Sequence, residues 1–215
     1  MTAYERYKKL MLERPEEFKP SEKGLLRIVT DPEIIKQYED KTGEKIGVVY
    51  ESPYHLMVVD LIDGGGDEYY TYERILEQHP GAAVILPITP KGDIVLLKQF
   101  RHSTRDEQYG LPHGFGTAKM TAEENARKEA GEEIGADDAK PILLGEVIAN
   151  SGLSGVRVKV FLFKVYDYRT IYGNEGIVEA AAYSKTTIDQ MIKNGKINDG
   201  FTLSAYALYC AKFSK

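Results

Sequence analysis

Apolar residues recur along the chain at two different spacings, and these spacings predict where helices and strands lie. Residues 4–13 place apolar side chains three and four positions apart, which predicts a short helix. A second helix is expected between Asp31 and Gly43, because Asp is a favoured N-cap, Pro32 suits the first helical position and glycine suits a helix end. Two helices are therefore expected before the first strand.

Strand-like runs fill much of the remaining chain. Short apolar or alternating runs predict strands at 46–50, 56–62, 69–76, 82–88, 94–100, 141–148, 156–166 and 180–183. Turns are expected at 63–67 and 90–93, and a loop is expected from residue 101 to Gly114. The early strands form a hairpin extension that runs into the main domain without a flexible linker.

Three further helices are expected in the second half of the chain. One begins at Thr121, where Thr121 and Glu124 have the spacing of a capping box, and the other two cover residues 187–194 and 199–213. Strands and helices do not alternate as they do in a doubly wound sheet. The predicted fold class is therefore α+β.

Composition and charge exclude several classes of protein. Hydrophobic residues make up 42% of the 215 residues and the net charge is −5, which argues against a general binder of nucleic acid or of anionic membranes. Cys210 is the single cysteine of the sequence, so an intrachain disulfide is impossible and a reducing cytoplasm is expected. No stretch is long and apolar enough to span a bilayer, so a soluble cytoplasmic protein is expected.

The run 114–136, GFGTAKMTAEENARKEAGEEIGA, carries the densest candidate chemistry. It places Glu129, Glu132 and Glu133 on about one turn of the helix predicted from Thr121, because successive helical residues are about 100° apart. A charge run on a helix is usually a solvated face. Three carboxylates this close repel one another, however, and a hard divalent cation such as Mg²⁺ or Mn²⁺ would relieve that repulsion.

The spacing in this run resembles the Nudix box, G-x5-E-x7-R-E-U-x-E-E-x-G-U, in which U is aliphatic. The residues that match without insertion or deletion are Gly114, Glu129, Glu132, Glu133 and Gly135. Met120 stands where the family has its first Glu, and Lys128 stands where the family has Arg. The resemblance implies a Nudix fold, in which helices enclose a mixed β-sheet.

Flanking segments resemble the ADP-ribose pyrophosphatase branch of this family. They are a hairpin, GAAVILPITPKGDIVLLKQFRHS, the stretch LPHG before the box, and the C-terminal MIKNGKINDGFTLSAYALY. The resemblance implies a Nudix domain at residues 81–215, preceded by an N-terminal extension at residues 1–80. In that branch a β-extension commonly mediates a homodimer, and residues 46–76 are the candidates for that role.

The resemblance implies a Mg²⁺- or Mn²⁺-dependent hydrolase of a nucleoside diphosphate linked to another moiety, such as ADP-ribose or a nucleotide sugar. Glu129 and Glu133 match the metal-binding positions, and Glu132 lies beside them. A further carboxylate usually comes from a loop between the last strands. Glu175 is the first candidate for this base or extra ligand, and Glu179 is the second.

Three other residues are candidates for substrate binding. Arg101 matches the Arg at the end of the hairpin, and its planar guanidinium suits a phosphate or the terminal ribose. His113 and Gly114 lie at the start of the box. Arg101 is equally compatible with a surface salt bridge, and Glu175 with a solvated loop acid.

Three departures from the family surround this one site. Met120 removes a carboxylate, Lys128 keeps the charge of Arg but loses its bidentate fork, and Gly110 stands where the branch usually has a metal-binding Glu. Asp106 or Glu107, on the loop before Gly110, is a candidate to replace the lost carboxylate.

These departures keep two alternatives open beside the hydrolase. The first is a Nudix-fold module that binds a nucleotide with weakened or absent turnover and acts in sensing or regulation. The second is an interaction protein that uses only the scaffold. The retained glutamates at positions 129, 132 and 133 favour the enzyme, since a pure binder has no need for clustered carboxylates.

Overall fold

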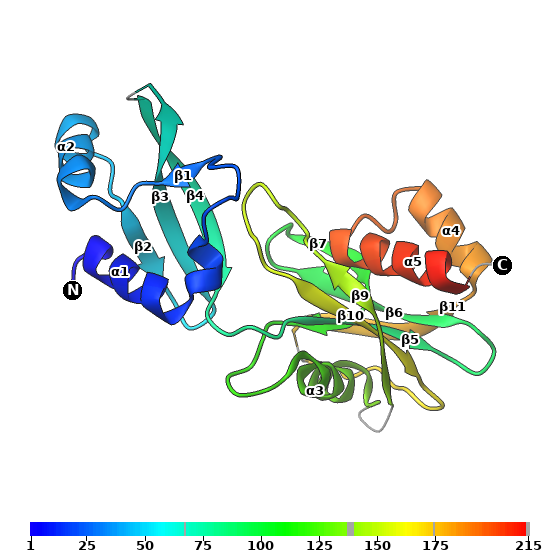
Figure 1. Cartoon of the computed structure of the whole chain (residues 1–215). Coiled ribbons are helices and arrows are strands. Elements are labelled where there is room, and N and C mark those ends of the chain that lie inside the picture. The colour runs from blue at the N-terminus through cyan, green and yellow to red at the C-terminus, as the bar shows by residue number, and fades with distance from the viewer. Residues whose placement is uncertain (67, 137–139, 174, 214–215) are drawn as a thin grey trace. The chain divides into compact units, whose positions relative to one another are not determined.

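The computed structural model describes residues 1–66, 68–136, 140–173 and 175–213 (Figure 1). These residues form two compact units. The first contains Met1–Gln78 and Asn150–Val156, and the second contains His79–Ala149 and Arg157–Lys215. The assignment of residues 1–80 as an extension of a domain at 81–215 stays a prediction. None of the helices in the described residues combines the length and apolar character that a membrane span requires.

The first unit is a small antiparallel sheet covered by helices. Its elements in chain order are α1 (Ala3–Glu13), the 3₁₀ turn η1 (Pro15–Phe18), β1 (Arg27–Ile28), α2 (Pro32–Thr42), β2 (Gly47–Glu51), β3 (His55–Gly65) and β4 (Glu68–Glu77). β4 pairs along the whole length of β3, so β1 and β2 share the opposite edge of β3. Both predicted helices are confirmed, and Gly43 ends α2 in the left-handed conformation. Of the turn predicted at 63–67, residues 63–65 belong to β3, and residue 67 lies outside the described residues.

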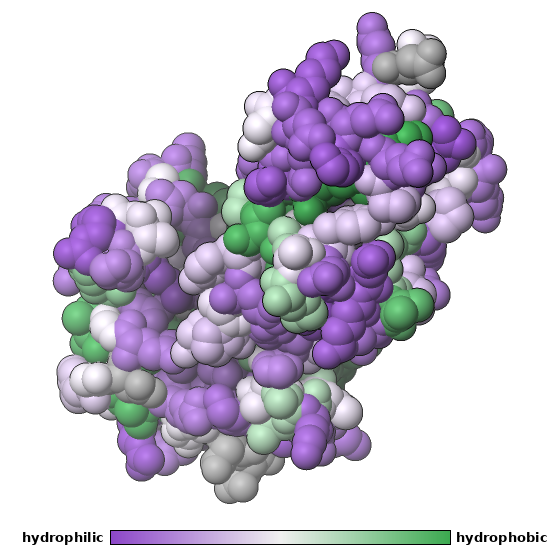
Figure 2. Space-filling view, turned by 90° about the vertical axis from the view of Figure 1, so that its left-hand side faces the viewer, coloured by the Kyte–Doolittle hydropathy of each residue, from purple (hydrophilic) through white to green (hydrophobic). Residues whose placement is uncertain are grey.

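The central strand β3 is apolar on both of its faces. Leu56 and Val58 pack in a cluster with α1, whereas Val59 and Leu61 pack in a second cluster with Ile35 of α2. This double burial explains why the run at 56–62 is almost continuously apolar instead of alternating. On the face shown in Figure 2, hydrophilic side chains predominate and apolar side chains reach the surface in small separate patches.

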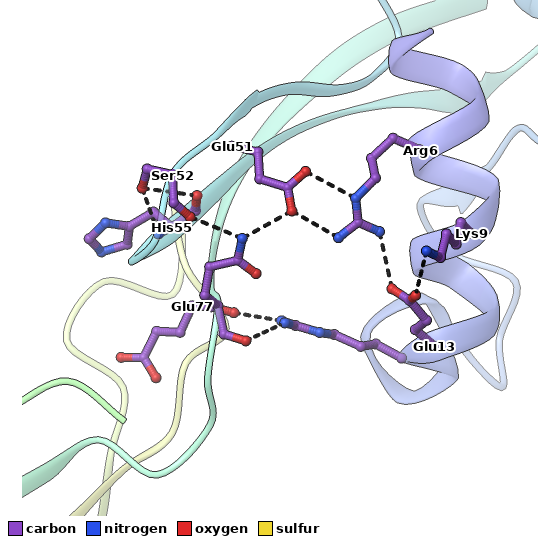
Figure 3. Close-up of polar contacts among 9 residues, drawn as sticks. Arg6, Lys9, Glu13, Glu51, Ser52, His55 and Glu77 are labelled. Carbon is purple, nitrogen blue, oxygen red and sulfur yellow. Dashed lines mark hydrogen bonds and ion pairs between the residues drawn. The ribbon is translucent and has the colours of Figure 1, made fainter. Parts of the chain in front are cut away.

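A network of polar contacts holds α1 against the ends of β2 and β4 (Figure 3). Arg6 donates two hydrogen bonds of 3.0 Å to the Glu51 carboxylate, and Gln78 donates a third of the same length. Arg14 donates to the backbone carbonyls of Glu77 and Gln78 at 2.5 and 2.6 Å. The Arg6 guanidinium and then the Gln78 amide lower the pKa of Glu51 to about 2.

The second unit is a seven-stranded mixed sheet with helices on both faces (Figure 1). Its strands are β5 (Ala83–Ile88), β6 (Ile94–Arg101), β7 (Asp106–Gly110), β8 (His113–Gly114), β9 (Pro141–Val147), β10 (Val158–Lys164) and β11 (Ile177–Tyr183). The order is β11-β6-β5-β10-β9, with β7 paired to β6 and β8 paired to β5. β5 and β10 are parallel and the other pairs are antiparallel.

Helix α3 (Ala122–Ile134) covers one face of this sheet, and α4 (Lys185–Lys193) and α5 (Gly200–Phe213) cover the other (Figure 1). α3 buries Ala126, Ala130 and Ile134 in a core with Ile85 and Phe163 of the sheet. Small side chains on this face bring the helix axis close to the strands. The predicted α+β class is confirmed.

Two segments differ from their predictions. No strand was expected before the helix at 31–43, but β1 lies between α1 and α2 and pairs with Ile62 and Asp63 of β3. Residues 101–114 were expected to form a loop, but they contain β7 and β8. β7 carries the sequence DEQYG and pairs antiparallel with β6, where Lys98 and Glu107 form a cross-strand ion pair of 2.5 Å. Because the first three residues of β7 are polar, its sequence has no hydrophobic period and gives no strand signal.

Candidate active site

The candidate site is built on the buried polar stripe of α3. Thr121 caps the helix N-terminus, with Glu124 completing the capping box, and Gly135 ends the helix in the left-handed conformation. Between these caps, Glu129 and Glu133 stand four residues apart on one face and are 6% and 1% exposed. The helix therefore turns two ionisable side chains inward beside its apolar stripe.

Glu133 is the most buried of the three glutamates. Its Oε2 accepts a 3.0 Å hydrogen bond from the backbone N–H of His113. Its Oε1 is buried and has no hydrogen-bond partner among the described residues. Burial, followed by the negative charges of Glu175 and Glu129, raises the pKa of Glu133 to about 8. A buried carboxylate oxygen without a hydrogen-bond partner can bind a proton or a cation.

Gly114 lies directly against the Glu129 carboxylate. A Cβ at position 114 would lie 2.2 Å from the carboxyl carbon of Glu129 and 2.4 Å from Oε1. Glycine is therefore required here by close approach and not by a turn conformation. Burial raises the pKa of Glu129, while the neighbouring Lys128 opposes that shift.

Glu132 differs from its two neighbours because its side chain is exposed. The Lys128 ammonium contacts Glu132 Oε2 at 2.7 Å and Glu129 Oε1 at 3.1 Å. The lysine thus keeps the positive charge of the family arginine and pairs with two of the three glutamates.

Arg101 and His113 form a second part of the site, at the ends of β6 and β8. Arg101 Nη2 lies 2.9 Å from His113 Nε2, and His113 Nδ1 lies 2.8 Å from the carbonyl oxygen of Leu111. Burial, followed by the positive charge of Arg101, lowers the pKa of His113. The histidine is therefore neutral at pH 7, with its proton on Nδ1 toward Leu111 and its Nε2 accepting from Arg101.

Glu175 precedes β11 and acts electrostatically on the α3 glutamates. Its negative charge contributes to the raised pKa values of both Glu133 and Glu129. Glu179, the second candidate, instead lies opposite Lys98 in the β11–β6 pairing. The pKa of that lysine is raised chiefly by Glu107, and Glu179 adds a smaller contribution. Of the two acids, the structure places Glu175 with the α3 glutamates.

Two relatives align with most of the chain. An ADP-ribose pyrophosphatase of Bacillus subtilis (strain 168) is 25% identical over 177 residues, which are 81% of this chain and 93% of that protein. A GDP-mannose pyrophosphatase of Yersinia enterocolitica serotype O:8 / biotype 1B (strain NCTC 13174 / 8081) is 26% identical over 161 residues, which are 69% and 83% of the two chains. No family model matches the chain.

A solved structure shares the fold. The crystal structure of an ADP compounds hydrolase superposes with a TM-score of 0.58 at 17% identity, covering 77% of this chain and 89% of that chain. The chain therefore resembles these pyrophosphatases in sequence, and the predicted Nudix fold is confirmed.

The residues that depart from the Nudix box have distinct surroundings. Met120 is 39% exposed in the turn before α3. Gly110 faces the start of α5, where a Cβ would lie 3.4 Å from Thr202 Oγ1 and 3.9 Å from Asp199 Oδ2. Glu107 pairs with Lys98 instead of replacing the carboxylate that is missing at position 110.

Several polar residues that build the site give no signal in the sequence. Thr202 Oγ1 accepts from the Leu111 N–H at 2.9 Å, so the N-terminus of α5 holds the loop before β8. Asn125 is fully buried; it donates to the Phe115 carbonyl and accepts from Thr117 Oγ1, both at 2.8 Å. Buried polar side chains at 99, 125 and 202 are not distinguishable from surface residues by sequence pattern alone.

The carboxylates of α3 lie close together without forming a complete metal site among the described residues. In the part of the chain that the structure describes, no three His, Cys, Asp or Glu side chains form a ready-made metal site. Carboxylate oxygens are nevertheless the donors that Mg²⁺ and Mn²⁺ prefer, and Glu133 Oε1 is a buried acceptor without a partner among the described residues. The donor set therefore fits a hard divalent cation.

Proposed function

We propose that this protein is a metal-dependent Nudix pyrophosphohydrolase that cleaves the pyrophosphate bond of ADP-ribose-like or nucleotide-sugar substrates. The observation that carries the proposal is Glu133, a buried carboxylate that lies near Glu129 and Glu175 with one oxygen unpartnered among the described residues. Burying such a group in ionised form is costly unless a cation joins it. The names of the two relatives supply the substrate class.

Glu129, Glu132 and Glu133 are the residues that would hold Mg²⁺ or Mn²⁺. When bound, the ion would neutralise charge on the pyrophosphate and raise the acidity of a water molecule. Glu129 and Glu132 would first release Lys128, which contacts them at 3.1 and 2.7 Å. Gly114 leaves the Glu129 carboxylate the space that any side chain would fill.

The remaining residues of the site bind and orient the substrate. Arg101 would donate to a phosphate or to the terminal ribose, since its guanidinium lies at the site beside a neutral His113 that does not add a second positive charge. Glu175 would accept the proton of the attacking water or serve as a further ligand. Water would attack one phosphorus of the pyrophosphate, and the bond from that phosphorus to the bridging oxygen would break. The other phosphate monoester would leave with the bridging oxygen, so two phosphate monoesters would form.

Two further parts of the proposal concern assembly and location. A homodimer formed through residues 46–76 and a cytoplasmic location both stay predictions. The same holds for the absence of nucleic-acid and membrane partners.

A second candidate function is a nucleotide-binding module with weak or absent turnover. The contacts of Lys128 favour it, because an ammonium that already neutralises Glu129 and Glu132 reduces their need for a metal. Met120 and Gly110 point the same way, since each removes a carboxylate that the family has at this site.

The test is hydrolysis of ADP-ribose, nucleotide sugars, dinucleoside polyphosphates and nucleoside triphosphates with Mg²⁺ or Mn²⁺. Glu133→Gln is expected to lower kcat about 1,000-fold, roughly 4 kcal/mol of transition-state stabilisation, without unfolding the protein. Glu123→Gln is the matched control, because Glu123 lies on the exposed first turn of the same helix and pairs only with Arg127 among the contacts of the described residues. Nucleotide binding without turnover in the wild type would support the binding module instead.

A further inference from the structure

The backbone that carries Glu175 has an unusual conformation. Glu175 has φ +48° and Gly176 has φ +77°, so two successive residues lie in the left-handed region. The ladder between β11 and β6 is irregular at the same place, since Ile177 pairs with Gln99 whereas Glu179 pairs with Lys98. A non-glycine residue in this conformation persists only where its surroundings hold it there.

Two contacts with β6 hold this backbone. The Phe100 N–H donates to the Gly176 carbonyl at 2.9 Å, and a Cβ on Gly176 would lie 2.9 Å from the Phe100 carbonyl oxygen. Gly176 is therefore pressed against β6 so closely that any other residue would push the two segments apart. The position of Glu175 is fixed from its C-terminal side by this contact.

Gln99 supplies the second contact. Its side chain is 3% exposed, and its Nε2 donates a 2.7 Å hydrogen bond to the carbonyl oxygen of Glu175. Its Oε1 is buried without a partner among the described residues. A buried amide oxygen without a partner destabilises the folded protein. This cost is explained if the hydrogen bond from the same side chain holds a functional segment in place.

We propose that Gln99 is a positioning residue for Glu175, holding the strained backbone at 175–176 so that the Glu175 carboxylate stays beside Glu133 and Glu129. The inference rests on the proposed function, because it gives Glu175 a role in hydrolysis. Gln99 itself contacts the backbone of Glu175 and acts through it. The position of the Glu175 backbone is thereby held by a side chain from a different strand.

The first test is a double-mutant cycle with Gln99→Met and Glu175→Gln. Methionine keeps the length of the side chain and removes its hydrogen-bond donor. Gln99→Met is expected to lower kcat about tenfold while the KM for substrate stays within about twofold, because binding through Arg101 is untouched. In the Glu175→Gln background, Gln99→Met is expected to have no further effect on kcat. A merely structural role would instead lower kcat by the same factor in both backgrounds, and that result, or an unchanged kcat in Gln99→Met, would overturn the proposal.

A second pair of variants covers the case in which Gln99→Met does not fold. Gly176→Ala disturbs the same backbone from its other end and is expected to lower kcat in the same way. Gly173→Ala is the matched control: Gly173 has a similar φ of +78°, but a Cβ there meets nothing within 4 Å. Equal losses of kcat in the two alanine variants would contradict a specific role for the contact with β6.

A readout that does not need turnover separates this inference from the proposed function. Hydrogen–deuterium exchange of the Gly176 and Ile177 amides is expected to rise at least tenfold in Gln99→Met, while exchange in β5 stays unchanged. Absence of hydrolysis by the wild type would sink the proposed function. Unchanged exchange at Gly176 and Ile177 would sink the positioning role, whatever the wild type hydrolyses.

Discussion

Glu51 in the first unit and Glu133 in the second are glutamates with opposite surroundings. Glu51 is exposed and accepts three hydrogen bonds from Arg6 and Gln78, and its pKa falls to about 2 (Figure 3). Glu133 is buried near two other carboxylates with one oxygen unpartnered among the described residues, and its pKa rises to about 8.

The difference separates a structural carboxylate, Glu51, from Glu133, for which we propose a functional role. Glu51 has its counter-charge built into the fold, so its ionised form stabilises the contact between α1 and β2. The fold provides Glu133 with only one hydrogen bond, from the His113 N–H, and opposes its ionisation. A strongly perturbed acid of this kind, at a site with matching neighbours, indicates a role in binding or catalysis.

Replacing Gly114 tests whether packing around the glutamates is as exacting as the structure indicates. Gly114→Ala is expected to lower kcat about 100-fold, because its Cβ would lie 2.2 Å from the Glu129 carboxyl carbon and displace that side chain. Gly200→Ala, at the start of α5, is the control, since a Cβ there meets nothing within 4 Å. Steady-state kinetics of both variants measures the effect, and an active Gly114→Ala variant would contradict the geometry.

The pH dependence of stability, measured without metal, tests the difference between Glu51 and Glu133. Glu133 has a folded-state pKa of about 8, above its unfolded value, so its contribution is present in full below the unfolded pKa and is lost as the pH rises through 8. The free energy of unfolding is therefore expected to fall by on the order of 3 kcal/mol between pH 5 and pH 8.

Chemical denaturation at several pH values measures this loss. Glu77 in the first unit also has a raised pKa, of about 7, so the wild type must be compared with Glu133→Gln, in which only the Glu133 contribution disappears. Parallel curves for the two proteins would mean that Glu133 titrates normally.

Restoring the carboxylate that the Nudix family has at position 120 tests whether added negative charge strengthens metal binding. Met120→Glu is expected to tighten Mn²⁺ binding about threefold to tenfold, since it adds a negative charge in the turn before α3. Calorimetric titration with Mn²⁺ gives the affinity, and Met120→Gln controls for the change in shape. Weaker binding in Met120→Glu would mean that the site has been rebuilt around the methionine.

The smallest expected effect is in the first unit. Glu51→Gln is expected to lower the free energy of unfolding at pH 7 by about 0.5 kcal/mol, because the paired carboxylate is partly exposed and screened by solvent. Glu51 has a lowered pKa, so its contribution is present above the unfolded pKa and is lost as the pH falls toward 2. Denaturation at pH 7 and pH 3 checks both statements, and kcat is expected to stay unchanged.

Much of the fold was predictable because local signals agreed with the final structure. The predicted caps Asp31, Gly43 and Thr121 set helix ends where the structure has them. β7 was missed because its first three residues are polar and carry no hydrophobic period, and only pairing with β6 makes it a strand. The place of Asn150–Val156 with the first unit has no sequence signal either.

For the site, the sequence determined which residue types are available and tertiary structure decided what each one meets. Spacing alone put Glu129 and Glu133 on one face of a helix, because helix geometry is local. Other relations at the site join residues 15 to 76 positions apart, namely the contact of Gly114 with Glu129 and the hydrogen bond from Gln99 to Glu175. The unpartnered oxygen of Glu133 among the described residues depends on burial. Such relations arise only when the sheet and α3 pack together, since the desolvation and charge of each group depend on neighbours that the chain brings close by folding.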